Sequence, residues 1–175
     1  LEPSNKGAAS EAKSWNAPLV ITEFGYGPDA IQADNYLRWQ TELQDQYQAS
    51  AFFWVWKEQS QGSWGIYSHD AASGHWTERD HLRQALSRVV PEAVSGWPTS
   101  FGYDREARRF ELRFTGDPAI TAPSRIFVPA AADIGASFDV SCDGAARASA
   151  RDEETGIVEV ACGGAGNHTI VLTGR

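Results

Sequence analysis

Two uninterrupted apolar runs, separated by one helix-length segment, constrain the fold more than any other feature of the sequence. The first run begins at Leu19 and reaches Glu23 just before Gly25 breaks the chain. The second run spans residues 51–56 and is followed by Lys57. An apolar run without alternation is typical of a strand buried on both faces. Two such strands joined by a helix predict a parallel βαβ unit.

Two parallel strands do not make a domain, because their edges and both of their apolar faces need partners. We therefore expect residues 1–95 to be the final βαβα portion of a (β/α)8 barrel, whose other strands lie on a preceding segment. The 175-residue chain starts at Leu1 and contains no Met, as expected for either a mature secreted protein or a piece of a longer one, and the incomplete sheet favours the second.

Helical periodicity predicts helices over residues 4–15, 30–47 and 78–90. The second helix opens on a capping-box pattern, in which Asp29 is followed three residues later by Gln32. The residues expected on its apolar face are Ala33, Tyr36, Leu37, Leu43 and Tyr47. A small hairpin is expected within the loop that joins the second strand to the third helix.

The apolar period changes from helical to two across residues 91–98, which marks a domain boundary. Short alternating strands separated by turns predict an antiparallel β-sandwich over residues 96–175. The alternating apolar pairs are Phe101 and Tyr103, Phe110 and Leu112, Ile126 and Val128, Phe138 and Val140, Val158 and Val160, and Ile170 and Leu172.

The two cysteines, Cys142 and Cys162, lie late in the sequence. A hairpin centred on residues 152–154 would place them opposite each other, within reach of a disulfide. The alternative is a pair of buried thiols. A disulfide predicts an oxidising compartment, so we expect a secreted, extracellular protein.

Glu23 is the first candidate for catalysis. It is the one charged residue at the end of an otherwise apolar strand. Barrel enzymes place their active sites at the C-terminal ends of their strands. The alternative role is that of a helix cap or a structural ion pair.

Tryptophans follow Glu23 on the next strand. Trp54 and Trp56 are two residues apart, so on a strand they share a face. Indole rings pack on the apolar faces of sugars, whereas their alternative role is core packing. We expect these two residues to line a carbohydrate-binding cleft. Further residues expected to bind substrate there are Lys57, Tyr26 and Trp64. The alternative for Lys57 is an ordinary solvated pair with Glu58.

Composition excludes several other functions. The net charge of −8 argues against nucleic acid or an anionic membrane as the main partner. No apolar stretch is long enough for a transmembrane segment. The sequence has no glycine-rich phosphate loop, zinc pattern or serine nucleophile elbow. Its four histidines lack metal-ligand spacing and are expected at the surface, so we expect no metal or organic cofactor.

Both apolar runs resemble the last two strands of a family 5 glycoside hydrolase barrel. The matching segments are Pro18-Leu-Val-Ile-Thr-Glu23-Phe-Gly25 and Phe52-Phe-Trp-Val-Trp-Lys57-Glu58. The resemblance implies that Glu23 is the catalytic nucleophile and that a Trp, preferably Trp54, lines the subsite beside the scissile bond. A family 5 endo-β-glucanase or mannanase is one activity of this kind.

The later segments are more similar to endoglycoceramidases, secreted enzymes that release the intact glycan from the ceramide of glycosphingolipids. The matching segments are Phe101-Gly-Tyr-Asp104, Arg109-Phe-Glu-Leu-Arg-Phe114, Arg125-Ile-Phe-Val-Pro129 and Val140-Ser-Cys-Asp-Gly144. In this family the acid/base Glu follows an Asn, and the sequence contains no Asn-Glu pair. The resemblance thus implies that the acid/base residue lies on the N-terminal part of the same barrel. A non-catalytic carbohydrate-binding β-sandwich is the alternative from another class of protein.

Overall fold

The computed structural model describes residues 1–59 and 64–175. The chain divides into two compact units, Leu1–Leu86 and Ser87–Arg175. This division lies earlier than the predicted boundary between residues 95 and 96. The reason is that β5 (Val90–Ala93) is a strand paired with β8 (Ser124–Phe127), so Pro91 lies in the second unit instead of ending a long helix.

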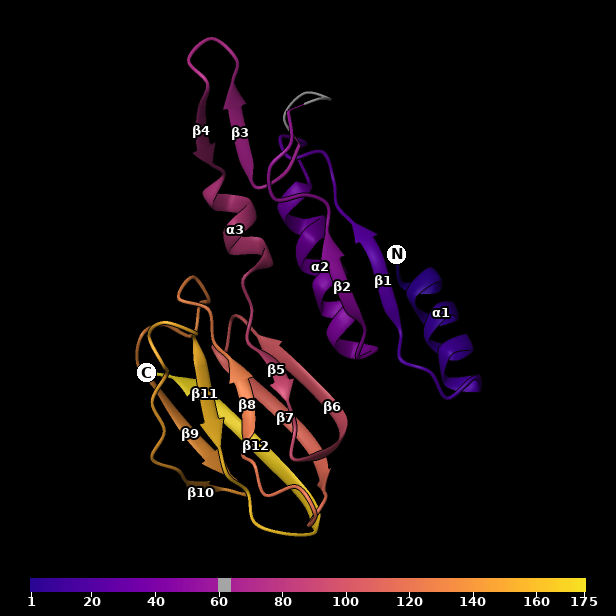
Figure 1. Cartoon of the computed structure of the whole chain (residues 1–175), viewed down its shortest axis with the longest axis vertical. Helices are drawn as coiled ribbons and strands as arrows, with labels where there is room; N and C mark the ends of the chain where they lie inside the picture. The colour runs from indigo at the N-terminus through magenta and orange to yellow at the C-terminus, as the bar shows by residue number, and fades with distance from the viewer. Residues whose placement is uncertain (60–63) are drawn as a thin grey trace. The chain divides into compact units, whose positions relative to one another are not determined.

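Unit 1 alternates helices and strands, as the sequence predicts (Figure 1). Its elements in chain order are α1 (Glu2–Ser14), β1 (Val20–Phe24), α2 (Ala33–Gln46), β2 (Ser50–Phe53), β3 (Tyr67–Asp70), β4 (His75–Glu78) and α3 (Asp80–Leu86). Strands β3 and β4 form the predicted hairpin, with His69 opposite Trp76. Part of the loop before this hairpin lies outside the described residues. No described helix is long and apolar enough to cross a membrane.

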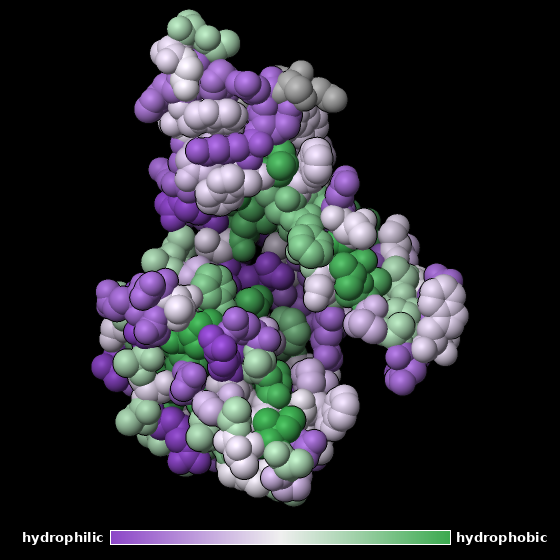
Figure 2. Space-filling view, in the orientation of Figure 1, coloured by the Kyte–Doolittle hydropathy of each residue, from purple (hydrophilic) through white to green (hydrophobic). Residues whose placement is uncertain are grey.

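Strands β1 and β2 form the predicted parallel pair, with Ile21 opposite Ala51. One face of the pair packs into a small core with α2 and α3, built around Leu37 and Leu82. The other face is open in the described chain: Val20 is 47% and Phe52 is 65% exposed. Figure 2 shows hydrophobic side chains at the surface over these strands. The expectation that both faces are buried is therefore wrong for the chain taken by itself.

Helix α2 differs from the prediction in its start and in its buried face. Asp29 does not cap the helix, because the N-cap position is taken by Gln32 and the Asp29 carboxylate binds Arg79 instead. Leu43 and Tyr47 are only partly buried. The buried positions include four polar residues: Gln40, Thr41, Gln44 and Asp45. Gln40 donates a hydrogen bond to Asn5 of α1 at 3.4 Å, which accounts for one of these polar groups.

Unit 2 is the predicted antiparallel β-sandwich. Its remaining strands are β6 (Gly96–Asp104), β7 (Arg109–Gly116), β9 (Phe138–Cys142), β10 (Ala145–Ala146), β11 (Ile157–Val160) and β12 (Gly166–Gly174). They form one sheet with the order β10-β9-β12-β7-β6 and a second with the order β11-β8-β5. Alternate residues of both sheets meet in one core that includes Phe110, Ile126 and Ile170, each 0% exposed. The strict period of two predicted this core because it places every second side chain on the same face.

The disulfide between Cys142 and Cys162 is present, with the two Cα atoms 5.9 Å apart. The hairpin predicted to carry it is wrong. Strand β9 pairs with β12, which places Cys142 opposite Ile170, whereas β11 pairs with β8 in the other sheet. The disulfide thus links β9 of one sheet to the chain that follows β11 of the other, so it joins the two layers of the sandwich.

His168 was expected at the surface and is instead buried at 8% exposure. Its Nδ1 lies 2.8 Å from the Asp143 carboxylate, and its Nε2 lies 3.2 Å from the Gly164 carbonyl oxygen. The hydrogen bond with Asp143 raises the pKa of His168 above its usual 6.5. The same bond lowers the pKa of Asp143 below its usual 3.8, with help from the Thr169 N–H. The neighbouring cysteines are oxidised, so the group of Cys142, Cys162 and His168 is not a thiolate metal site.

This pair predicts that the stability of the sandwich depends on pH. The raised pKa of His168 stabilises the fold below about pH 6.5, and this gain is lost as the pH rises through the folded-state pKa. The lowered pKa of Asp143 stabilises the fold above about pH 3.8. We expect Asp143→Asn to lower the free energy of unfolding more at pH 5 than at pH 8. The difference should be about 1 kcal/mol or less, because the carboxylate is half-exposed.

Urea unfolding at both pH values measures this difference. The matched control is Asp139→Asn on β9, the strand that precedes Asp143, because Asp139 pairs with Arg175, which stays charged throughout. The control should lower stability equally at pH 5 and pH 8. An Asp143→Asn effect that is also equal at both values would contradict the prediction.

Candidate functional site

Glu23 lies at the C-terminal end of β1 with its side chain exposed. Strand β1 runs parallel to β2, so the chain segments that follow both strands emerge at the same edge of the sheet. The Trp54 N–H donates a hydrogen bond to the Phe24 carbonyl oxygen at 2.8 Å. The backbone of Trp54 is thereby held directly beside the residue that follows Glu23.

Gly25 allows this close approach of the two strand ends. A Cβ atom at residue 25 would lie 2.5 Å from the Trp54 carbonyl oxygen, a distance that no side chain tolerates. The glycine is therefore required by packing against the neighbouring strand end. The sequence shows it only as a break in an apolar run.

Trp54 and Trp56 do not share a strand, contrary to the prediction. Strand β2 ends at Phe53, and both tryptophans lie in the irregular segment that follows. The segment leaves the sheet because it pairs with the returning chain: the Ile66 N–H donates to the Val55 carbonyl oxygen at 3.2 Å, and the Tyr67 N–H to that of Trp56 at 3.4 Å. Trp54 is 51% and Trp56 is 58% exposed, so both indoles are accessible to a ligand.

Lys57 lies over aromatic rings of the hairpin. Its Nζ is 4.6 Å from the centre of the Tyr67 ring and 5.4 Å from that of Trp76. Tyr67 also packs against Trp56, with ring centres 5.1 Å apart. The cation–π contacts occupy one face of these rings and orient an exposed ammonium group whose N–H donors suit sugar hydroxyls or a carboxylate.

Tyr26 and Trp64 lie on different loops of unit 1, after β1 and before β3. The Tyr26 ring stacks on Tyr36 of α2 with centres 4.8 Å apart. Burial raises the pKa of Tyr36 above its usual 10.0, and Tyr26 adds to this rise. Trp64 is half-buried and directly precedes Gly65.

The ring and cation–π contacts join Trp56 and Lys57 through Tyr67. The backbone hydrogen bond brings Trp54 to the strand that carries Glu23.

One residue at this edge gave no signal in the sequence. Arg79 is 9% exposed, and its guanidinium binds Asp29 and the Gly65 carbonyl oxygen. In the sequence Arg79 lies between Glu78 and Asp80, where a charged residue is ordinary at the start of a helix. Only the path of the loops shows that it is enclosed.

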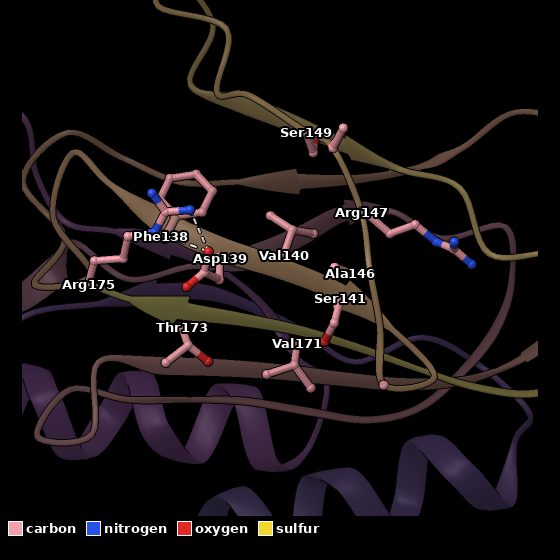
Figure 3. Close-up of a pocket in the computed structure, with 12 residues that line it drawn as sticks. Phe138, Asp139, Val140, Ser141, Ala146, Arg147, Ser149, Val171, Thr173 and Arg175 are labelled. Carbon is pink, nitrogen blue, oxygen red and sulfur yellow. Dashed lines mark hydrogen bonds and ion pairs between the residues drawn. The ribbon is translucent and has the colours of Figure 1, made fainter.

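Unit 2 carries a groove of about 470 Å³ on the outer face of its larger sheet (Figure 3). Side chains of β9 and β12 that point away from the core form its floor, among them Ser141 and Thr173, and residues 146–149 cross above it. At one end Arg175 binds Asp139 and lowers the pKa of that carboxyl below its usual 3.8. The groove is lined mainly by small and polar groups.

The sandwich is similar in sequence to a known family of domains. Residues 88–172, which lie within unit 2, match the family model of the glycoside hydrolase family 5 C-terminal domain. The chain as a whole resembles the C-terminal part of an endoglycoceramidase. Endo-glycoceramidase II from Rhodococcus sp. superposes with a TM-score of 0.73 and 26% sequence identity over 98% of this chain.

The same Rhodococcus protein in its ganglioside GM3 complex superposes with a TM-score of 0.72 and 25% identity. The match covers 98% of this chain and 35% of that one, so the chain spans about a third of the relative's length. Sterylglucosidase 1 from Cryptococcus neoformans superposes with a TM-score of 0.63 at 15% identity, over 97% of this chain and 32% of its own. This second likeness concerns the fold alone. A search of curated protein sequences finds no match.

Proposed function

We propose that this chain is the C-terminal part of a secreted retaining glycoside hydrolase that cleaves the bond between the glycan and the ceramide of glycosphingolipids. The observation that carries the proposal is the similarity to endo-glycoceramidase II over 98% of the chain, at 26% identity and with Glu23 at the end of β1. A structure of that relative is described as its lactosyl-enzyme intermediate, which is what a retaining mechanism forms.

Glu23 acts as the nucleophile in this proposal. Its ionised carboxylate attacks the anomeric carbon of the sugar next to ceramide, and the bond from that carbon to the ceramide oxygen breaks. A second carboxyl, about 5–5.5 Å away, gives its proton to the ceramide oxygen. It then takes a proton from water, which attacks the same carbon, releases the glycan and restores Glu23. Water is the only reactant besides the substrate, so these steps need no metal or organic cofactor.

The second carboxyl comes from the N-terminal part of the same barrel. Support for this partner comes from the open face of the β1–β2 pair, where Val20 and Phe52 are exposed. Parallel strands are normally covered on both faces, and the inner face of a barrel packs against side chains of the other strands. A preceding segment that completes the barrel would cover this face and add the acid/base Glu.

Residues at the β1–β2 edge are suited to a sugar. Trp54 and Trp56 expose indole faces, and Lys57 presents N–H donors beside them. We assign Trp54 to the subsite beside the scissile bond, because its backbone is hydrogen-bonded to the strand that carries Glu23. Tyr26 and Trp64 are assigned to the rim of the same cleft.

Turnover of two substrate classes by the complete enzyme tests the proposal. We expect release of intact glycan and ceramide from gangliosides and galactosylceramides, with little hydrolysis of soluble β-glucan or mannan. Mass spectrometry of the products measures both. Preferential hydrolysis of soluble glucan or mannan would instead identify a family 5 endo-β-glucanase or mannanase. Glycan binding by the sandwich groove without hydrolysis would favour the non-catalytic module.

A further inference from the structure

Arg79 is enclosed by two loops that follow different strands. Its Nε and Nη2 groups donate to the two oxygens of the Asp29 carboxylate, each at 3.2 Å. The Arg79 Nη1 group donates to the Gly65 carbonyl oxygen at 2.9 Å. The backbone N–H of Arg79 donates to the Ile66 carbonyl oxygen at 2.7 Å. A planar guanidinium binds a carboxylate through two parallel bonds and still has further donors, which a lysine ammonium cannot reproduce.

Asp29 belongs to the loop that leaves β1 six residues after Glu23. The same loop is held a second time from α3, where the His81 Nε2 lies 3.2 Å from the Pro28 carbonyl oxygen. The side chain of Asp29 is 75% exposed, so this carboxylate stays solvated while it binds the buried arginine. The start of α3 therefore fixes the path of the chain directly after the proposed nucleophile.

Gly65 lies against the segment that carries the tryptophans. Its φ is +103°, and a Cβ atom there would lie 2.3 Å from the Val55 carbonyl oxygen and 3.0 Å from that of Trp56. The next two residues, Ile66 and Tyr67, donate their N–H groups to those same two carbonyls. Whatever holds the Gly65 carbonyl therefore also holds the backbone of residues 55–56.

We propose that Arg79 is a positioning residue, which ties the loop following Glu23 to the segment bearing Trp54 and Trp56. The arginine acts through Asp29 on one side and through Gly65 on the other, so a single buried group sets the spacing of the two strand ends. The expected effect of Arg79 on turnover rests on the proposed function. The expected effect of Arg79 on the two loops rests on the geometry alone.

Hydrogen exchange in the complete enzyme tests the effect on the loops. We expect Arg79→Met to speed exchange about tenfold or more in two peptides at once, residues 25–32 and 65–71, while the core of α2 keeps its protection. Asp29→Asn should speed exchange in residues 25–32 and spare 65–71, because the bond to Gly65 remains. The matched control is Arg83→Met within α3, four residues after Arg79, where the arginine makes partly exposed ion pairs with Glu78 and Asp80.

Kinetics of the same variants test the effect on the site. Displacing the reacting groups by about 1 Å costs about 10²-fold, so kcat/KM of Arg79→Met should fall to that extent, mainly through kcat. Arg79→Lys should recover only part of the loss, and Arg83→Met should match the parent enzyme. All rates are taken well below the melting temperatures. A loss that disappears on cooling, or faster exchange everywhere in unit 1, would mean that Arg79 only stabilises the fold.

Two outcomes separate this inference from the proposed function. If the parent enzyme cleaves no glycosphingolipid, the proposed function fails, and the exchange data still decide whether Arg79 joins the loops. If the parent enzyme is active but Arg79→Met leaves exchange in residues 25–32 unchanged, or kcat/KM within twofold, the inference is overturned and the function stands.

Discussion

Replacing Glu23 with Gln is expected to abolish glycosidase turnover in the complete enzyme, with a loss of about 10⁴-fold or more in kcat. The amide keeps the shape of the side chain but cannot attack the anomeric carbon. Because Glu23 is exposed at the end of β1, the substitution removes no core contact, and the melting temperature should stay near that of the parent. Activity on a fluorogenic aryl glycoside and a thermal melt measure the two quantities.

Glu42→Gln on the exposed side of α2 is the matched control and should keep full activity. A further test separates a nucleophile from a merely structural carboxylate. With Glu23→Ala, added azide should attack the anomeric carbon of an activated aryl glycoside, expel the phenolate and yield a glycosyl azide of inverted configuration. Near-normal turnover of Glu23→Gln, or a glycosyl azide of retained configuration, would remove Glu23 from the role of nucleophile.

Loss of the disulfide is expected to destabilise the sandwich by about 3 kcal/mol. Cys142 and Cys162 are 20 residues apart in the sequence, and closing a loop of that length restricts the unfolded chain by about this amount. Cys142 is also fully buried in the shared core, so Cys142→Ala with Cys162→Ala leaves a small gap between the sheets in addition. The free energy of unfolding of unit 2, measured by urea titration, should fall accordingly.

Urea titration of the parent protein with a reducing agent separates the loss of the bridge from the loss of core packing, because reduction opens the bridge without removing the sulfur atoms. Reduction should account for more than half of the stability loss that the double substitution causes. A double variant within about 0.5 kcal/mol of the parent would show that the sheets are held together by their core alone.

The strands of unit 2 could be predicted because their signal is local. Phe110, Leu112 and Phe114 alternate along one strand, and each is 0–1% exposed in the core. The alternation does not state which strands are neighbours. It is compatible with a hairpin around residues 152–154, whereas β9 pairs with β12 and β11 with β8. The disulfide prediction was correct although its hairpin was not, since the two sheets of a sandwich also bring their strands within bonding distance.

The sequence by itself determined that a carboxylate, Glu23, ends an apolar strand and that two tryptophans stand at the end of the next apolar run. These are properties of residue type and order. Tertiary structure alone decided that Trp54 and Trp56 lie beyond the end of β2, and that Asp29 serves Arg79 instead of capping α2. The physical reason is that unpaired carbonyls and carboxylates bind the nearest donor in space. For Val55 and Trp56 that donor is the returning chain, and for Asp29 it is an arginine 50 residues later.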